Sequence, residues 1–185
     1  IKCGAAFLSN LPDRLFVEYI DIMKFDIITI FPDIIESYFS KSVIGRAQQQ
    51  RLVKITAHDL RHYTTDKRKT VDDKPYGGGP GMIMQITPIY QALKKIRNLK
   101  LKSRTILLTP RGKTFTQQDA KRLKKYDQLI LVCGRYEGFD ERVNNFVDEK
   151  ISLGKFVLAG GEIPAMAITE SIVRLIDGVL GKKES

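Results

Sequence analysis

The stretch that decides the fold runs from Leu129 to Pro164 and reads LILVCGRYEGFDERVNNFVDEKISLGKFVLAGGEIP. It opens with an uninterrupted apolar run, Leu129–Cys133, which is typical of a strand buried on both faces. Two further strand-like pieces follow, Ile151–Leu153 and Lys155–Leu158. Each of the three pieces ends at or close to a glycine. These glycines are Gly134, Gly154 and Gly160.

Glycines that recur at strand ends indicate a binding site. In open α/β sheets, ligands bind just past the carboxyl ends of the strands. Glycine lets the backbone turn sharply, or lets a ligand lie against the main chain. The cluster therefore predicts a small-molecule pocket at this edge of the sheet, and three ordinary turns are the alternative.

The composition indicates one basic domain. With 185 residues and 43% hydrophobic residues, the chain is long enough for a single domain with its own core. The net charge of +10 and the pI of about 9.6 favour a nucleic-acid partner, with a merely solvated basic surface as the alternative. No apolar run is long enough to predict a membrane span. The sparse cysteines, Cys3 and Cys133, favour a reducing, cytoplasmic setting.

Strand and helix patterns alternate along the chain, which predicts an α/β fold with a mainly parallel sheet flanked by helices. Residues 1–22 differ from the rest, and we expect them to be a non-native or upstream extension before a natural start at Met23. Strands are expected over 25–31, 52–57, 105–109 and 129–133, and helices over about 34–50, 87–98, 117–125, 139–146 and 164–177. The expected helix-end residues are Asp33 with Glu36 in a capping box, Pro88 at a first helical position, and Gly178.

Four familiar chemistries lack support. The glycine-rich stretch Gly77–Gly81 has no Gly-Lys-Ser/Thr ending, so it is no P-loop, and no Gly-x-Gly-x-x-Gly follows the first strand. His58 and His62 are four residues apart, as zinc ligands on a helix could be, but no second ligand cluster exists. With only these two histidines, a Ser-His-Asp hydrolase is also disfavoured. The polar segment 58–81 is instead the kind of long loop that is usually functional or disordered.

Three long motifs carry a resemblance to a known family. They are Val71–Met82 (VDDKPYGGGPGM), Leu131–Gly138 (LVCGRYEG) and Gly160–Met166 (GGEIPAM). In this order they resemble the bacterial tRNA (guanine-N1-)-methyltransferases of the SPOUT superfamily, and the resemblance extends from Met23 to Glu184. That family methylates the guanine immediately 3′ of the anticodon, at position 37 of tRNA.

The resemblance implies a SPOUT-type domain over 23–181 with a deep C-terminal trefoil knot, and a homodimer with its active site at the subunit interface. It implies S-adenosyl-L-methionine as the methyl donor, S-adenosyl-L-homocysteine as the product, and leaves a Mg²⁺ dependence open. The implied donor-binding residues are Leu108, Thr109, Pro110, Gly134, Tyr136, Glu137, Leu153, Gly154, Lys155, Phe156, Val157, Leu158, Gly160, Gly161 and Pro164. The expected tRNA-binding residues are Arg46, Asp72, Lys74, Tyr76, Gly77, Gly78, Gly79 and Arg135, joined on the basic surface by Lys67, Arg68 and Lys69.

The resemblance also implies catalytic residues. Arg174 matches the arginine that faces O6 of the guanine, and a solvated residue on the last helix is the alternative. Glu137 and Asp72 are candidates for reading the guanine edges, and for Asp72 the alternative is a turn residue in a charged loop. Removal of the N1 proton requires a general base. In the family this base is an aspartate in a linker to a helical tRNA-gripping domain.

The chain departs from the family at its end. Gly178–Gly181 is followed only by Lys182–Ser185, so the expected aspartate falls just beyond the end. We therefore expect residues 182–185 to begin the interdomain linker. The chain as given is expected to bind the donor but to be poorly active. Two alternatives stay open: another SPOUT RNA methyltransferase, acting on a ribose 2′-OH or another base, and a non-catalytic RNA-binding module. The loop Tyr76–Gly81 favours the guanine-N1 reading.

Overall fold

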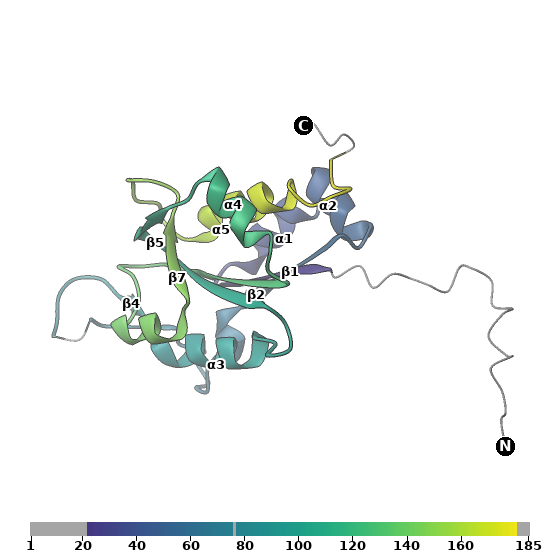
Figure 1. The fold of residues 1–185 in the computed structure, drawn as a ribbon. Coiled ribbons are helices and arrows are strands. Elements are labelled where there is room, and N and C mark those ends of the chain that lie inside the picture. Colours follow the sequence, from purple (N-terminus) through teal and green to yellow (C-terminus); the bar gives the residue numbers. More distant parts are fainter. Residues whose placement is uncertain (1–21, 76, 181–185) are drawn as a thin grey trace, which may run out of the picture.

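The computed structural model describes residues 22–75 and 77–180, and its main sheet is parallel, as predicted (Figure 1). Five strands lie in the order β2-β1-β6-β5-β7, and each neighbouring pair runs parallel. The strands are β1 (Met23–Thr29), β2 (Val53–Asp59), β5 (Ser103–Thr114), β6 (Gln128–Cys133) and β7 (Glu149–Ser152). The expected extension up to residue 21, with Cys3, as well as Tyr76 and the expected linker start 182–185, lie outside the described residues.

Helices cover both faces of this sheet (Figure 1). One face carries α1 (Pro32–Phe39), α2 (Ser42–Gln49), α4 (Gln117–Leu123) and α5 (Glu162–Val173). The other carries α3 (Ile86–Ile96) with the 3₁₀ turns η1 (Leu60–Tyr63) and η2 (Glu141–Phe146). A short hairpin pairs β3 (Asp72–Asp73) with β4 (Ile83–Met84). Among residues 22–75 and 77–180, none of the helices combines the length and the hydropathy that a bilayer crossing needs.

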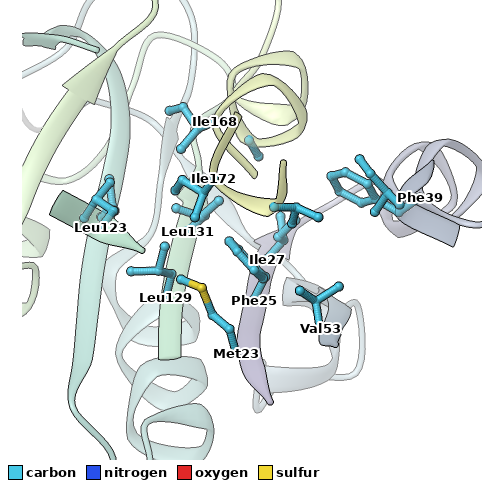
Figure 2. Packing of buried hydrophobic residues seen from close by; sticks show 14 of the residues in the cluster. Met23, Phe25, Ile27, Phe39, Val53, Leu123, Leu129, Leu131, Ile168 and Ile172 are labelled. Carbon is cyan, nitrogen blue, oxygen red and sulfur yellow. The ribbon is translucent and has the colours of Figure 1, made fainter. Parts of the chain in front are cut away.

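The core has two parts because the central strands are buried on both faces. Leu129 and Leu131 of β6 pack with Ile168 and Ile172 of α5 on one face (Figure 2). The alternate residues of the same strand, such as Ile130, join the cluster under α3. Each fully buried aliphatic side chain contributes about 1.5–3 kcal/mol. A strand in this position therefore needs the continuous apolar run that the sequence shows.

The helix expected over 34–50 is broken into α1 and α2. Ser42 begins α2 with φ 61°, so the chain turns sharply between the two helices. An added Cβ at Gly45 would lie 2.5 Å from the carbonyl oxygen of Ser40, so glycine permits the close approach. The predicted Asp33 cap is also wrong. Phe31 is the N-cap without a side-chain hydrogen bond, and Pro32 occupies the first helical position, which its fixed φ favours.

The third strand-like piece, 155–158, forms no strand. Hydrogen bonds between Ser152 Oγ and both backbone groups of Gly154 turn the chain directly after β7. Beyond this turn Phe156 and Val157 are 55% and 83% exposed, so these two apolar side chains are not part of the hydrophobic core. The segment is therefore a loop in which Phe156 and Val157 remain exposed.

Three helix boundaries also differ from expectation. The predicted helix over 139–146 is the 3₁₀ turn η2, and Gln85 caps α3, which places Pro88 in its third position. The last helix ends with Arg174 as its C-cap. Gly178 has φ 86° and lies in the turns that follow, so it is not the cap.

The chain crosses over itself next to β5. From β6 it passes across β5 to β7, and the loop after β7 returns to β6, where the Gly161 N–H donates to the carbonyl of Gly134 at 2.8 Å. Residues 134–161 thus form a loop around the carboxyl end of β5. The trefoil knot implied by the resemblance stays a prediction.

Candidate functional site

A cavity of about 1130 Å³ lies at the carboxyl ends of β5, β6 and β7. Most of its walls come from three segments: residues 107–111 at the irregularity within β5, the loop 134–144 after β6, and residues 150–164, which end β7 and continue into the loop and helix after it. The pocket predicted from the glycine-ended strand pieces is therefore present. All but one of the implied donor-binding residues line it, and the exception is Lys155, which is exposed.

The glycines of this cavity make room for other parts of the chain. An added Cβ at Gly134 would lie 2.7 Å from the ring of Phe139, and one at Gly161 would lie 2.7 Å from Cys133 Cα. At Gly160 it would overlap the side chains of Arg135 and Glu162. At these three positions glycine therefore permits the close approach of neighbouring chain segments. Larger residues at these positions would first disturb the packing of the walls.

The glycine-rich loop 77–81 is attached to the rim of the cavity. Backbone hydrogen bonds join Glu137 N to Met82 O at 2.9 Å and Met84 N to Gly138 O at 2.8 Å. An added Cβ at Gly81 would lie 2.5 Å from Glu137 Cγ. Three exposed glycines of the loop have φ values of 94°, 84° and 122°, which side chains disfavour. They are Gly77, Gly78 and Gly79.

Asp72 and Tyr136 lie near each other at this rim. Burial raises the pKa of the Tyr136 hydroxyl, and the negative charge of Asp72 raises it further. Tyr136 has φ 59° and is 46% exposed, so its ring projects from a constrained turn. Asp72 is half-buried in β3, and the exposed Lys74 follows it. Asp72 itself is not among the residues that line the cavity, so its role in reading a bound base stays a prediction.

Charged side chains line the mouth of the cavity in pairs. Arg142 hydrogen-bonds Asp140 at 2.6 Å and lowers the pKa of that carboxyl. Arg111 and Glu141, both highly exposed, approach to 3.9 Å from opposite loops. Arg135, predicted to contact RNA phosphates, forms an ion pair with the buried Glu162 at 3.0 Å.

Several predicted residues lie away from the cavity. Arg174 is exposed at the end of α5, ten residues after the lining residue Pro164, so about 15 Å of helix separates it from the cavity wall. Arg46 belongs to α2, which lies at the far end of the molecule from β4 and the glycine-rich loop (Figure 1). Residues 67–69 are exposed in the loop between η1 and β3. Within one chain, therefore, neither Arg174 nor Arg46 reaches the pocket.

Sequence reasoning missed several lining residues. Arg111, Phe139 and Ser152 belong to the walls, although no motif singled them out. Arg111 directly follows the predicted Pro110, and Phe139 directly follows the second motif. Extending each motif through the whole loop would have found both.

A metal site finds no support in the described ranges, where no group of three or more His, Cys, Asp or Glu residues could hold an ion. His58 instead lies 2.7 Å from Asp26 and 3.1 Å from the hydroxyl of Tyr63. Cys133 is a buried free thiol, and burial raises its pKa well above the usual value.

Comparison with known proteins gives one consistent result. The family model described as tRNA (Guanine-1)-methyltransferase TrmD matches residues 23–185. Curated relatives named tRNA (guanine-N(1)-)-methyltransferase include that of Syntrophotalea carbinolica, 47% identical over 163 residues, which cover 88% of this chain and 66% of the relative. That of Dictyoglomus turgidum is 48% identical over 164 residues, which cover 89% of this chain and 66% of the relative.

A solved structure is similar as well. The crystal structure of tRNA (m1G37) methyltransferase from Aquifex aeolicus matches with a TM-score of 0.80 and 38% identity, over 87% of this chain and 73% of that chain. The present chain spans just under two thirds, 66%, of the length of the first curated relatives. From the family match over residues 23–185, together with these identities and the shared fold, the chain belongs to the tRNA (guanine-1)-methyltransferase TrmD family.

Proposed function

We propose that the protein transfers a methyl group from S-adenosylmethionine to N1 of the guanine immediately 3′ of the anticodon of tRNA. The observation that carries this proposal is the cavity at the ends of β5, β6 and β7, lined by all but one of the residues expected to bind the donor. Family membership narrows the chemistry to guanine-N1 methylation of tRNA. In this proposal residues 23–181 act as one methyltransferase domain.

The lining suits the proposed donor. Apolar side chains such as Leu108 and Leu158 suit an adenine ring, while carboxylates such as Glu137 suit the positive sulfonium and ammonium groups. Arginines at the mouth, Arg111 and Arg142, suit the carboxylate of the methionine moiety. At about 1130 Å³ the cavity is slightly larger than typical ligand pockets, which span roughly 300–1,000 Å³.

S-adenosylmethionine would supply an activated methyl group on a sulfonium, whose sulfur keeps the electron pair when the C–S bond breaks. The protein's part is placement, because an in-line transfer needs the acceptor nitrogen held close to the methyl carbon. The acceptor must also lose its N1 proton to a base. Charge then builds on O6, where a positive group would stabilise it.

Two carboxylates at the rim, those of Asp140 and Glu137, differ in how well each could act as the general base that removes the guanine N1 proton. Asp140 is a poor candidate because Arg142 lowers its pKa, and a carboxylate held charged in this way accepts protons weakly. Glu137 is exposed on the wall beside the glycine-rich loop, and in this proposal it and Asp72 are the candidates for hydrogen-bonding the guanine edge. The base itself is expected in the linker that follows this domain.

A homodimer completes the proposed site. Arg174 lies at the opposite end of α5 from its own cavity, so it can face a guanine only in the cavity of a second copy. Exposed apolar side chains on α1 and α5 offer a surface for that copy. They are Ile34, Tyr38 and Ile163, beside a second cavity of about 580 Å³ lined by Met166. A cytoplasmic location and a Mg²⁺ dependence belong to the same proposal, and assays with and without EDTA test the latter.

Calorimetric titration with S-adenosylmethionine is the first test. Wild-type chain is expected to bind, and Val157→Trp, on the 83% exposed wall residue, is expected to weaken binding by filling the cavity. Leu99→Trp is the matched control, because Leu99 is 89% exposed and outside the cavity. Absence of binding by the wild-type chain would overturn the proposal in favour of a non-catalytic RNA-binding module.

The methylated product is the second test. Digestion of tRNA after reaction, followed by mass spectrometry, is expected to yield 1-methylguanosine from position 37. A transcript with adenosine at this position should yield none. Methylation of a ribose, or of another base, would favour the other RNA methyltransferase reading.

A further inference from the structure

Glu162 is a buried acid at the first position of α5, directly after Gly160 and Gly161. Its side chain is 3% exposed, and the carboxylate binds two other segments of the chain. One oxygen accepts a hydrogen bond from Thr29 Oγ1 at 2.7 Å, at the end of β1. The other accepts from Arg135 Nε at 3.0 Å, just after β6, and lies 3.0 Å from Nη2. One carboxylate thus connects the end of β1, the segment after β6 and the start of α5.

Arg135 extends this link to the loop that returns from β7. Its Nη1 donates to the carbonyl oxygen of Ala159 at 3.3 Å, and its guanidinium lies 4.5 Å from the ring centroid of Phe31. Ala159, Gly160 and Arg135 all line the large cavity. The side chains of Arg135 and Glu162 therefore fasten the wall after β6 to the wall formed by residues 159–161.

Gly160 fits this link closely. A Cβ at Gly160 would overlap both Arg135 Nε and Glu162 Oε2, so the ion pair occupies the space that a side chain would take. The adjacent Gly161 N–H donates to Gly134 O at 2.8 Å, between the same two walls. The glycine pair and the ion pair thus act together to hold the returning loop against β6.

A buried carboxylate is a costly way to hold a fold together. The desolvation of the two charges offsets much of their attraction, and apolar residues of similar volume often stabilise a protein equally well. What a fully bonded ion pair adds is fixed geometry, because charge-assisted hydrogen bonds to a planar guanidinium are directional. Here the fixed geometry concerns the walls of a binding cavity.

We propose that Glu162, acting through Arg135 and Thr29, is a positioning residue that fixes the 159–161 wall of the donor cavity before the ligand arrives. This inference rests on the proposed function, since the ligand is S-adenosylmethionine. Pre-organised walls avoid the cost of ordering the loop on binding. Loss of the carboxylate therefore weakens donor binding more than it weakens the fold.

The test compares Glu162→Gln with Glu149→Gln. Glu149 also holds two arginines, Arg104 at 3.0 Å and Arg122 at 2.8 Å, but neither of them lines the cavity, whereas Arg135 does. Titration with S-adenosylmethionine and S-adenosylhomocysteine is expected to show a roughly 10- to 100-fold loss of affinity in Glu162→Gln, by analogy with hydrogen-bond partners that orient metal ligands. Glu149→Gln is expected to keep the wild-type affinity, although its melting temperature falls by a similar amount.

Hydrogen exchange of the ligand-free protein supplies a readout that a general loss of stability would not give. In Glu162→Gln the Gly161 amide is expected to exchange faster, while the amides of the central strand β6 keep their protection. Thr29→Val, which keeps the ion pair, is expected to show a smaller change in the same direction. This variant replaces Glu162→Gln in the test if Glu162→Gln does not fold.

The outcomes separate the two proposals. Wild-type affinity in the Glu162 variant, or in Thr29→Val if that is the only folded one, overturns the positioning role and leaves the proposed function intact. Equal losses of affinity in the Glu162 and Glu149 variants also overturn it, because the effect would then follow stability. A wild-type protein that binds neither ligand overturns the proposed function, and this inference with it.

Discussion

Nε2 of His58 on β2 lies 2.7 Å from Oδ1 of Asp26 on the adjacent strand β1. The other oxygen of Asp26 accepts a hydrogen bond from Gln128 Nε2 at 2.7 Å, and Nδ1 of His58 lies 3.1 Å from the hydroxyl of Tyr63. The side chains of Asp26 and His58 are only 14% and 18% exposed. Asp26 therefore satisfies partners from two other strands, β2 and β6.

Asp26→Ala should destabilise the protein. The change leaves His58 and Gln128 without their shared acceptor, and an unsatisfied group at a poorly exposed site costs about 1–3 kcal/mol. Urea unfolding measures the free energy of unfolding. Asp33→Ala, on the exposed side of α1, is the control and should change it by no more than about 0.5 kcal/mol. Equal losses in the two variants would contradict a structural role for the Asp26 cluster.

Asp119 should make stability depend on pH in the acid range. Burial alone raises its pKa, but hydrogen bonds from Thr116 and Lys113 and the charge of Lys113 outweigh this effect and lower the pKa from 3.8 to about 2. A lowered folded-state pKa means that the contribution is present above 3.8 and is lost as the pH falls toward 2. The shift corresponds to about 2 kcal/mol.

Asp119→Asn should therefore lower the free energy of unfolding at neutral pH, and its difference from wild type should shrink between pH 4 and pH 2. Urea unfolding across this range gives the measurement. Asp177→Asn is the control, since the Asp177 side chain is 90% exposed. A wild-type curve parallel to that of Asp119→Asn throughout would mean that the Lys113 and Thr116 contacts do not form in solution.

Ile163→Glu should produce monomers. Ile163 is 55% exposed and lies on the same face of α5 as Met166, which lines the second cavity together with Ile34 and Tyr38 of α1. A buried, unpaired charge at the centre of this surface would oppose association. Sedimentation velocity of wild type, Ile163→Glu and the control Leu99→Glu measures the outcome. Dimers of unchanged stability in Ile163→Glu would place the proposed interface elsewhere.

Removal of the basic cluster at 67–69 should weaken tRNA binding and lessen its dependence on salt. Lys67, Arg68 and Lys69 are all exposed, and the salt slope should fall by about one for every phosphate that the variant no longer binds. Triple substitution to alanine is compared with Lys121→Ala/Lys125→Ala on the other face of the sheet. Fluorescence titrations between low and physiological salt give both slopes. A wild-type affinity that does not change with salt would count against phosphate binding altogether.

Sequence patterns were most informative for strands that are buried on both faces. The run Leu129–Cys133 predicted the central strand because a strand covered on both faces must be apolar throughout. The same rule misled at 155–158, since periodicity cannot distinguish an apolar strand from an apolar binding loop. The break between α1 and α2 was also missed, because it depends on the close approach of Gly45 to the backbone of Ser40.

The position of the site followed from its glycines, but the side-chain pairs within it could not. Thr29 and Glu162 are 133 residues apart, and their hydrogen bond depends on the order of strands in the sheet. Local patterns carry no information on such pairs. The glycines were also interpreted as space for a ligand, whereas the structure uses them for the close approach of chain segments.

The length of α5 sets a geometric constraint on the proposed enzyme. Glu162 begins the helix at one cavity, and Arg174 ends it, facing the cavity of the second copy in the proposed dimer. The length of the helix then sets the distance between the two proposed active sites. Inserting a single residue between its ends would advance Arg174 by about 1.5 Å and rotate it by roughly 100° around the axis, away from the second cavity. The same insertion would turn buried residues beyond it, such as Ile172, away from the core, so stability and methyl transfer should fall together.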